Sequence, residues 1–154
     1  MELLISLTVI WLTHALAPAI ITGGTGGIGL DTARLLAAKG ADLVLAYGSD
    51  DARAADAVKV LEADHGVRAR VVKGDLTQDE TRDATIDEIF RIVDDECGGR
   101  VGSVVHAAGF FAPRLLEVHL AGAMPNFTMY DEYQSIYPKT FVALAEGALG
   151  RMAD

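Results

Sequence analysis

Residues 20–29 read IITGGTGGIG, an apolar run that leads into a turn rich in glycine. The residues that follow, 30–39, can form a helix. A strand that passes into a helix through such a turn brings backbone N–H groups and the positive end of the helix dipole to one point, which favours binding of a phosphate group. Glycine permits the tight turn and lets the phosphate and the neighbouring helix approach the backbone closely. The segment therefore predicts a nucleotide-binding strand–turn–helix unit.

The chain beyond this turn alternates between predicted strands and helices. Short apolar runs typical of buried strands occupy residues 17–22, 42–47, 68–73 and 101–106. Helices are expected at 27–39, after Ser49, after Thr77 and after Thr128, with Pro138 kinking or splitting the last one. This alternation indicates an α/β fold whose parallel sheet is covered on both faces. Right-handed crossovers then predict a doubly wound Rossmann sheet in strand order 3-2-1-4, truncated after about four strands.

Three of these helices carry apolar residues at helical spacing, and those residues should face the sheet. The sets are Ala54, Ala57, Val58 and Leu61; Ile86, Ile89, Phe90 and Val93; and Phe141, Leu144, Ala145 and Ala148. Ser49 is expected to cap its helix, and Thr77 with Glu80 has the spacing of a capping box.

Length and composition predict one domain. The 154 residues can bury a core, and the net charge of −9 argues against a nucleic-acid partner. Cys97 is the only cysteine, so an intramolecular disulfide is excluded, and it is expected to pack passively. The four histidines are scattered without H-x-x-x-H spacing, so no metal site is predicted. We expect residues 17–154 to form an incomplete Rossmann domain behind an apolar extension, residues 1–16.

The extension reads MELLISLTVIWLTHAL and permits three interpretations. It is a non-native or unstructured addition, a membrane-associated segment, or a secretion signal ending at Ala15-Leu16-Ala17. The acidic Glu2, the lack of a positive start and Pro18 directly after the cut oppose secretion. A cytoplasmic location is expected, with membrane association through residues 1–16 as the alternative.

The spacing Gly23-x-x-x-Gly27-x-Gly29 after Thr22 resembles the T-G-x-x-x-G-x-G turn of the short-chain dehydrogenase/reductase family. Two further segments agree with the N-terminal, NAD(P)-binding half of that family. Asp75-Leu76 matches the position that contacts the adenine ring, and residues 106–109, His-Ala-Ala-Gly, stand where Asn-Asn-Ala-Gly usually packs beside the cofactor ribose. The last segment also resembles ketoreductase domains of polyketide synthases, and His106 is expected to be structural. The resemblance implies cofactor-binding residues Gly23, Thr25, Gly27, Ile28, Gly29, Tyr47, Ser49, Asp75, Leu76, Ala107, Ala108 and Gly109.

The end of the second predicted strand bears on the choice of cofactor. An acidic residue there would bind the ribose hydroxyls of NAD, whereas this chain has Tyr-Gly-Ser at 47–49, which resembles NADP-preferring members. A 2′-phosphate usually takes Arg or Lys, and Arg53 is the nearest in sequence. Asp50 and Asp51 would repel that phosphate unless they point away. NADP is predicted, with NAD as the alternative.

The catalytic group of the resembling family is a tyrosine with a lysine four residues later and a serine upstream. The residues four positions after the tyrosines at 47, 130, 133 and 137 are Asp51, Gln134, Tyr137 and Phe141, so no Tyr-x-x-x-Lys occurs. Tyr137 stands where many members carry an Asn, and no catalytic residue is predicted.

The sequence thus favours the cofactor-binding part of an NAD(P)-dependent oxidoreductase with an unknown small carbonyl or alcohol substrate. The alternatives are a non-catalytic nucleotide-binding module and a membrane-associated remnant. A homo-oligomer is left open.

Overall fold

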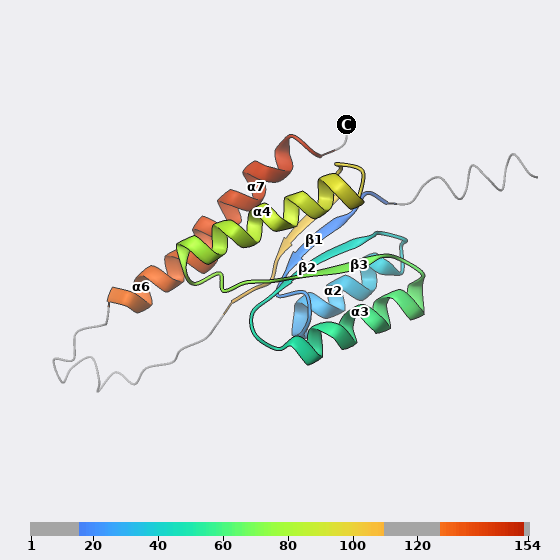
Figure 1. Cartoon of the computed structure of the whole chain (residues 1–154), viewed down its shortest axis with the longest axis horizontal. Coiled ribbons are helices and arrows are strands. Elements are labelled where there is room, and N and C mark those ends of the chain that lie inside the picture. The colour runs from blue at the N-terminus through green and yellow to red at the C-terminus, as the bar shows by residue number, and fades with distance from the viewer. Residues whose placement is uncertain (1–15, 110–126, 153–154) are drawn as a thin grey trace, which may run out of the picture.

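The computed structural model describes residues 16–109 and 127–152. Four parallel strands form one sheet in the order β3-β2-β1-β4, as predicted (Figure 1). They are β1 (Ala19–Thr22), β2 (Leu43–Tyr47), β3 (Ala69–Lys73) and β4 (Ser103–His106). Ile20 lies opposite Val44 on one side and Val104 on the other, which fixes the register of the central strand. Because all strands run the same way, their carboxyl ends meet along one edge of the sheet.

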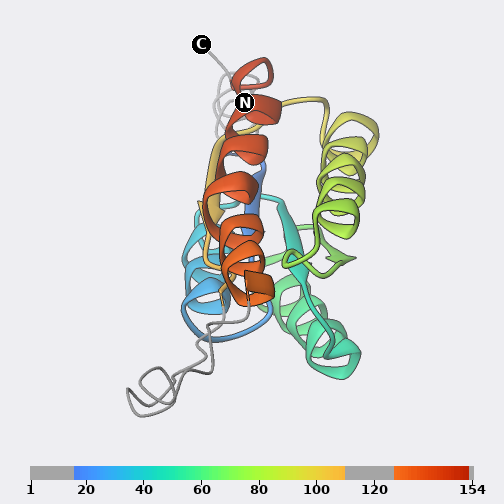
Figure 2. The ribbon, with the colours of Figure 1, turned by 90° about the vertical axis from the view of Figure 1, so that its left-hand side faces the viewer.

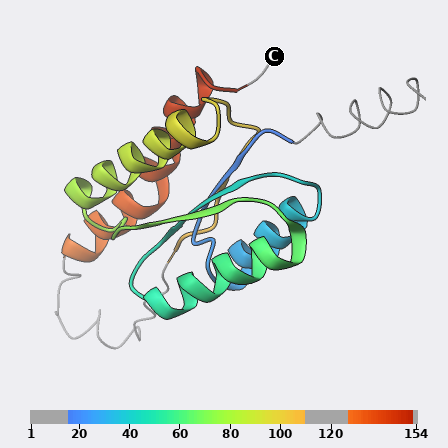
Figure 3. The same cartoon turned by 45° about the vertical axis from the view of Figure 1, so that its right-hand side comes forward.

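Helices cover both faces of the sheet, so the layers are helix, sheet and helix (Figure 3). α2 (Gly27–Ala37) and α3 (Asp51–His65) lie on one face. α4 (Asp79–Glu96) and α7 (Thr140–Leu149) lie side by side on the other (Figure 2). α7 continues from α6 (Phe127–Gln134) through η1 (Ser135–Lys139). The predicted doubly wound α/β fold is confirmed.

Two apolar cores result, one on each face of the sheet. The side chains of Ile20 and Val44 pack with Ile89 of α4 and Leu144 of α7. On the opposite face the strands pack against Ala33 of α2, together with other residues of α2 and α3. Fully buried Ile, Leu and Val side chains each contribute about 1.5–3 kcal/mol, so these two layers hold the strand ends in place. The apolar faces predicted for α3 and α4 are confirmed, with Val58 partly buried.

The last helical segment differs from the prediction at Pro138 and at Phe141. Pro138 lies within η1, a π-helical turn, so the helix continues through the proline instead of breaking. The buried stripe of α7 consists of Thr140, Leu144 and Ala148. Phe141 is 58% exposed, although its spacing predicted a core position, whereas Leu144 and Ala148 are buried as expected. Ala145 is only partly buried.

Helix starts also differ from the sequence prediction. Asp50, not Ser49, caps α3, because its Oδ1 accepts a hydrogen bond from the backbone N–H of Arg53 at 2.9 Å. α4 begins after Gln78 without a side-chain cap. The capping box at Thr77 does not form, because Thr77 donates both its N–H and its hydroxyl to Asp75 Oδ1.

The sheet strands are shorter at their starts than predicted. β1 begins at Ala19 instead of residue 17, and β4 at Ser103 instead of residue 101. Val101 instead forms an isolated parallel bridge with Met152 beyond α7. Within the described ranges no helix has both the length and the apolar character needed to cross a membrane. The interpretations of residues 1–15 concern a segment outside the described residues.

Candidate functional site

The glycine-rich turn connects β1 to α2 at the carboxyl edge of the sheet. Gly23 has a φ of +66°, and a Cβ on it would lie 2.9 Å from the backbone of Ala107. A Cβ on Gly29 would lie 2.2 Å from the carbonyl oxygen of Gly23, so the first turn of α2 packs directly on the glycine-rich turn. Gly24 N–H donates to the Ala46 carbonyl at 3.2 Å. The turn is therefore held on three sides by backbone contacts.

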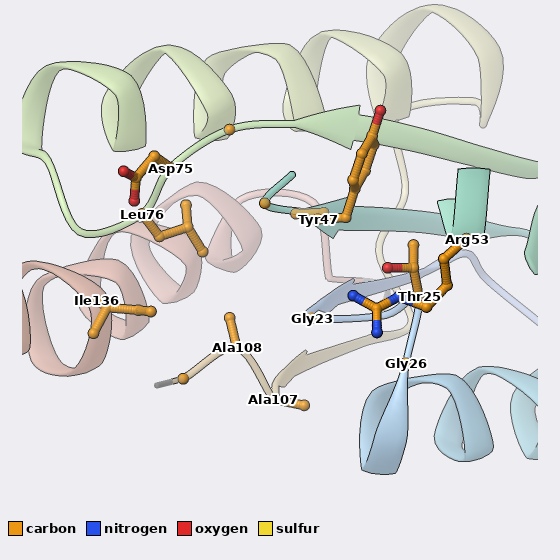
Figure 4. A pocket seen from close by; sticks show the side chains of 14 residues that line it. Gly23, Thr25, Gly26, Tyr47, Arg53, Asp75, Leu76, Ala107, Ala108 and Ile136 are labelled. Atoms are coloured by element: carbon orange, nitrogen blue, oxygen red, sulfur yellow. The ribbon is translucent and has the colours of Figure 1, made fainter. Parts of the chain in front are cut away.

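A pocket of about 330 Å³ opens beside this turn (Figure 4). It lies at the carboxyl ends of all four strands, where the loops that follow them converge. Its walls are Gly23, Thr25, Gly26, Ala46, Tyr47, Gly48, Arg53, Gly74, Asp75, Leu76, Ala107, Ala108, Gly109 and Ile136.

Most of the residues predicted from the sequence to bind a cofactor line this pocket. They are Gly23, Thr25, Tyr47, Asp75, Leu76, Ala107, Ala108 and Gly109. Gly27, Ile28, Gly29 and Ser49 lie outside the lining. Ile28 is 81% exposed in the first turn of α2, and Ser49 is exposed in the bend after Gly48.

The sequence named Arg53 only as the basic residue nearest to a 2′-phosphate, without placing it in the site, and it gave no indication of Ile136. Arg53 is the first basic residue after β2, but its reach depends on the start of α3. Its guanidinium comes within 3.4 Å of the position that a Cβ on Gly26 would take, and Figure 4 shows it reaching toward Thr25. Ile136 had no signal, because η1 brings it to the pocket from the far end of the chain.

Polar contacts between helices hold Ile136 in position. Arg82 of α4, whose side chain is 9% exposed, donates from Nη1 to Ser135 Oγ at 3.0 Å. Lys139 Nζ donates to Asp79 Oδ2 at 2.7 Å, and this contact is the main reason that the pKa of Asp79 falls to about 2. η1 is thereby fixed to α4 on both sides of Ile136.

The wall formed by β2 and α3 carries two acidic residues with partners. Asp50 caps α3, and its Oδ2 lies 3.6 Å from Arg53 Nε. Asp51 accepts hydrogen bonds from the Tyr47 hydroxyl at 3.0 Å and from Lys73 Nζ at 3.0 Å. The bond from Lys73, followed by that from Tyr47, lowers the pKa of the Asp51 carboxyl, and the same carboxylate raises the pKa of Tyr47.

Asp75 begins the loop after β3, where Gly74 allows close packing on α4. A Cβ on Gly74 would collide with Thr85 Oγ1 at 1.7 Å. Asp75 Oδ1 accepts from the Thr77 N–H at 2.9 Å and from its hydroxyl at 2.6 Å. Leu76, 6% exposed, completes this end of the pocket. The carboxylate thus fixes the loop that borders the pocket.

Thr22 and His106 connect the two central strands at the pocket edge. The Thr22 hydroxyl lies 2.7 Å from His106 Nδ1 and accepts the Ala108 N–H at 3.2 Å. Burial lowers the pKa of His106. Together, the contacts of Thr22 with His106 and Ala108 hold the Ala107–Ala108 wall against the glycine-rich turn.

The described residues contain no group of three or more His, Cys, Asp or Glu side chains placed to hold a metal ion. The pocket offers the backbone of a glycine-rich turn, the Arg53 guanidinium, the Asp75 carboxylate, the Tyr47 ring and apolar side chains. That combination suits a ligand with phosphate groups and flat or apolar parts.

Among curated proteins, sorbose reductase sou1 of Schizosaccharomyces pombe is 30% identical over 129 residues, covering 84% of this chain and 44% of the yeast protein. A phenolphthiocerol/phthiocerol polyketide synthase of Mycobacterium tuberculosis is 37% identical over 101 residues, covering 63% of this chain and 4% of that protein. The chain therefore spans less than half the length of either relative.

Solved structures with the same fold include L-sorbose reductase from Gluconobacter frateurii in complex with NADPH and L-sorbose. It is 26% identical with a TM-score of 0.72, covering 88% of this chain and 47% of that one. A blue fluorescent protein from a metagenomic library, in complex with NADPH, is 27% identical with a TM-score of 0.74, covering 92% and 54%. The model of the family described as short chain dehydrogenase matches residues 17–131, which is most of the chain. Sequence, fold and turn agree, and the chain belongs to the short-chain dehydrogenase family.

Proposed function

We propose that residues 17–154 form the cofactor-binding part of an NADP-dependent oxidoreductase that acts on a small carbonyl or alcohol. The observation that carries the proposal is the pocket between the glycine-rich turn and the Ala107–Gly109 segment, at the carboxyl ends of the strands. In an open α/β sheet, ligands bind where neighbouring strands lead to helices on opposite faces. Here β1 leads to α2 on one face, and the chain that follows β4 continues to α7 on the other.

The residues present fit a dinucleotide. Gly26 precedes α2 without a side-chain cap, and the first turn of that helix has no acidic residue. Its N–H groups are thus left for a pyrophosphate, which they bind together with the helix dipole. Gly48 has open space where a Cβ would stand, so the end of β2 leaves room beside Tyr47.

The lining suggests which parts of the cofactor each wall would contact. Leu76 and the backbone at Asp75 would flank the adenine ring, with Tyr47 and Arg53 toward the adenosine ribose. The small residues Ala107 and Ala108 would pack beside the second ribose. The nicotinamide, when bound, supplies or accepts the hydride. The 154 residues contain no Tyr-x-x-x-Lys, so the contribution proposed for this chain is binding and orientation, not proton transfer.

Two findings support NADP over NAD. β2 ends at Tyr47 where NAD-binding folds commonly place an acidic residue, and Arg53 extends into the pocket beside it. The Gluconobacter reductase and the metagenomic protein were both solved with NADPH. Both relatives are larger than this chain, so their substrates inform only the proposed class, a small carbonyl or alcohol.

Replacement of Gly26 tests the proposed pocket directly. Gly26 has a φ of −163°, which any residue adopts, so Gly26→Leu would add bulk in the pocket without backbone strain. We expect the variant to bind NADPH at least tenfold more weakly than the parent chain in isothermal titration calorimetry. The added side chain would occupy the space between the turn and Arg53.

Gly150→Leu is the matched control, since Gly150 has a φ of −75° and open space around it at the end of α7. It should bind NADPH like the parent chain. Failure of the parent chain to bind either NADPH or NADH would contradict the proposed function.

A further inference from the structure

The adenosine end of the pocket combines one cation with two nearby carboxylates. Arg53 extends from the first turn of α3 to Gly26, and it is the one Lys or Arg among the residues that line the pocket. Asp50 and Asp51 stand at the start of the same helix. A doubly negative ligand group would be repelled here if both carboxylates faced it. The contacts of each carboxylate therefore determine what this end of the pocket accepts.

The Asp50 carboxylate caps α3, and this contact holds it at the helix start. Its Oδ1 accepts the Arg53 N–H at 2.9 Å, while its Oδ2 is 3.6 Å from Nε of the same residue. That second contact is longer than a hydrogen bond. The terminal nitrogens of the guanidinium, on the Gly26 side, remain directed to the pocket.

Asp51 is held on the far side of Tyr47. Tyr47 presents its ring to the pocket, and Figure 4 shows its hydroxyl directed away from Arg53. That hydroxyl donates to Asp51 Oδ1 at 3.0 Å, and Lys73 Nζ at the end of β3 lies 2.9–3.0 Å from both carboxylate oxygens. Asp51 is absent from the pocket lining. The Lys73 ammonium and the Tyr47 hydroxyl thus keep the Asp51 carboxylate out of the cavity.

Under the proposed function, Arg53 is the residue that would bind a phosphate monoester on the adenosine 2′-position, as a nearby arginine does in NADP-binding folds. We propose that Lys73 is a positioning residue for this preference, because it holds Asp51 away from the phosphate. The inference rests on the proposed function and adds the residue that keeps the Asp51 carboxylate out of the phosphate subsite. A guanidinium suits the task, since its planar fork donates two parallel hydrogen bonds to phosphate oxygens. A phosphate monoester carries about −1.5 to −2 charges at neutral pH, so a carboxylate released near it would weaken its binding by repulsion.

The contacts of Lys73 determine where the Asp51 side chain lies and contribute little to folding stability. The side chains of Lys73 and Asp51 are 52% and 66% exposed, and exposed ion pairs contribute little to folding. Loss of Lys73 would leave Asp51 with one donor, Tyr47, and an uncompensated charge near the pocket. Physiological salt, with a Debye length of roughly 8 Å, would screen the resulting repulsion only in part.

The test compares 2′,5′-ADP with 5′-AMP, which differ only in the 2′-phosphate. Binding of each to the full 154-residue chain is measured by calorimetry at low salt. We expect 2′,5′-ADP to bind at least tenfold more tightly than 5′-AMP. Arg53→Ala should remove that difference by weakening 2′,5′-ADP, with 5′-AMP changed less than twofold, and Arg53→Lys should restore part of it. Arg34→Ala is the matched control, an exposed arginine of α2 that also pairs with an aspartate three residues away.

A second set of variants tests Lys73. Lys73→Met should weaken 2′,5′-ADP about three- to tenfold and leave 5′-AMP unchanged. Adding Asp51→Asn to Lys73→Met should restore the lost affinity, because the released charge is then gone. The same melting temperature for all variants, within a few degrees, separates these effects from misfolding.

The outcomes distinguish the inference from the proposed function. Equal loss of both nucleotides in Arg53→Ala would overturn the role of Arg53. Unchanged binding in Lys73→Met, or a loss that Asp51→Asn does not rescue, would overturn the role of Lys73. A parent chain that binds 5′-AMP and 2′,5′-ADP equally would overturn the inference alone. A parent chain that binds neither nucleotide, nor NADPH, would overturn the proposed function itself.

Discussion

The hydroxyl of Thr22 makes two hydrogen bonds that join β1 to the end of β4. It accepts the Ala108 N–H and shares the other hydrogen bond with His106 Nδ1. Burial of His106 lowers the pKa of its imidazole, while the nearby Ile136 carbonyl partly offsets this effect.

This geometry predicts a loss of stability at mildly acidic pH. The pKa of His106 is lower in the folded chain than in the unfolded chain, where it is about 6.5. As the pH falls through about 6.5, the unfolded state takes up a proton first, so the free energy of unfolding decreases. Urea unfolding at pH 7.5 and 5.5 should show this decrease in the parent chain and a smaller one in His106→Asn.

His65→Asn is the control for that experiment, since His65 ends α3 away from the β1–β4 pair. It should keep the pH dependence of the parent chain. The acidic groups with lowered pKa values, such as Asp79 at about 2, lose their pairing only at much lower pH and do not contribute in this window. An identical pH dependence in parent and His106→Asn would show that His106 is not the titrating group.

At the scale of elements, the buried stripe of α7 is narrower than the apolar spacing predicts. Thr140, Leu144 and Ala148 are buried at positions i, i+4 and i+8 of the helix, while Phe141 is 58% exposed. Regular spacing predicted both Phe141 and Leu144 as core residues. The sequence could not predict the difference, because both lie on one broad apolar face and tertiary packing decides which part of that face meets α4 and the sheet.

Two alanine substitutions test which residues of α7 are buried. Leu144→Ala should lower the free energy of unfolding by about 2–5 kcal/mol, since it leaves a cavity between α4 and the sheet. Phe141→Ala should change it by about 0.5 kcal/mol or less, as expected for a surface position. Chemical unfolding measures both. A cost at Phe141 as large as that at Leu144 would contradict the observed exposure of Phe141.

At the scale of the whole molecule, the sheet order followed from the sequence and the full pocket did not. Apolar runs separated by helical patterns allow few right-handed arrangements, and the predicted order 3-2-1-4 is the observed one. The backbone positions of the pocket followed from the glycine-rich turn and the strand ends. The positions of Arg53 and Ile136 in the pocket did not follow from the sequence, because a long side chain and a distant helix reach the pocket through tertiary packing.

The arrangement also predicts self-association of the chain. α7 and the residues after it expose Val142 at 51%, Leu149 at 72% and Met152 at 46%, next to β4 at the edge of the described sheet. Exposed apolar surface and strand edges favour association. Sedimentation velocity should show mass that rises with concentration. Val142→Gln with Leu149→Gln should reduce it, and Leu35→Gln on α2 serves as the control on another exposed apolar residue. A monomer at all concentrations would contradict this prediction.

The pairing of Thr22 with His106 determines when the pocket can form during synthesis of the chain. The two residues are 84 positions apart, and the strands that carry them lead to two of the pocket walls, the glycine-rich turn and the Ala107–Gly109 segment. At a synthesis rate of roughly 5–20 residues per second, the glycine-rich turn leaves the ribosome about 4 to 17 seconds before its opposite wall exists. During that interval one side of β1 has no partner strand. A nucleotide can therefore assist only the last stage of folding, and the nascent chain must stay soluble until then without it.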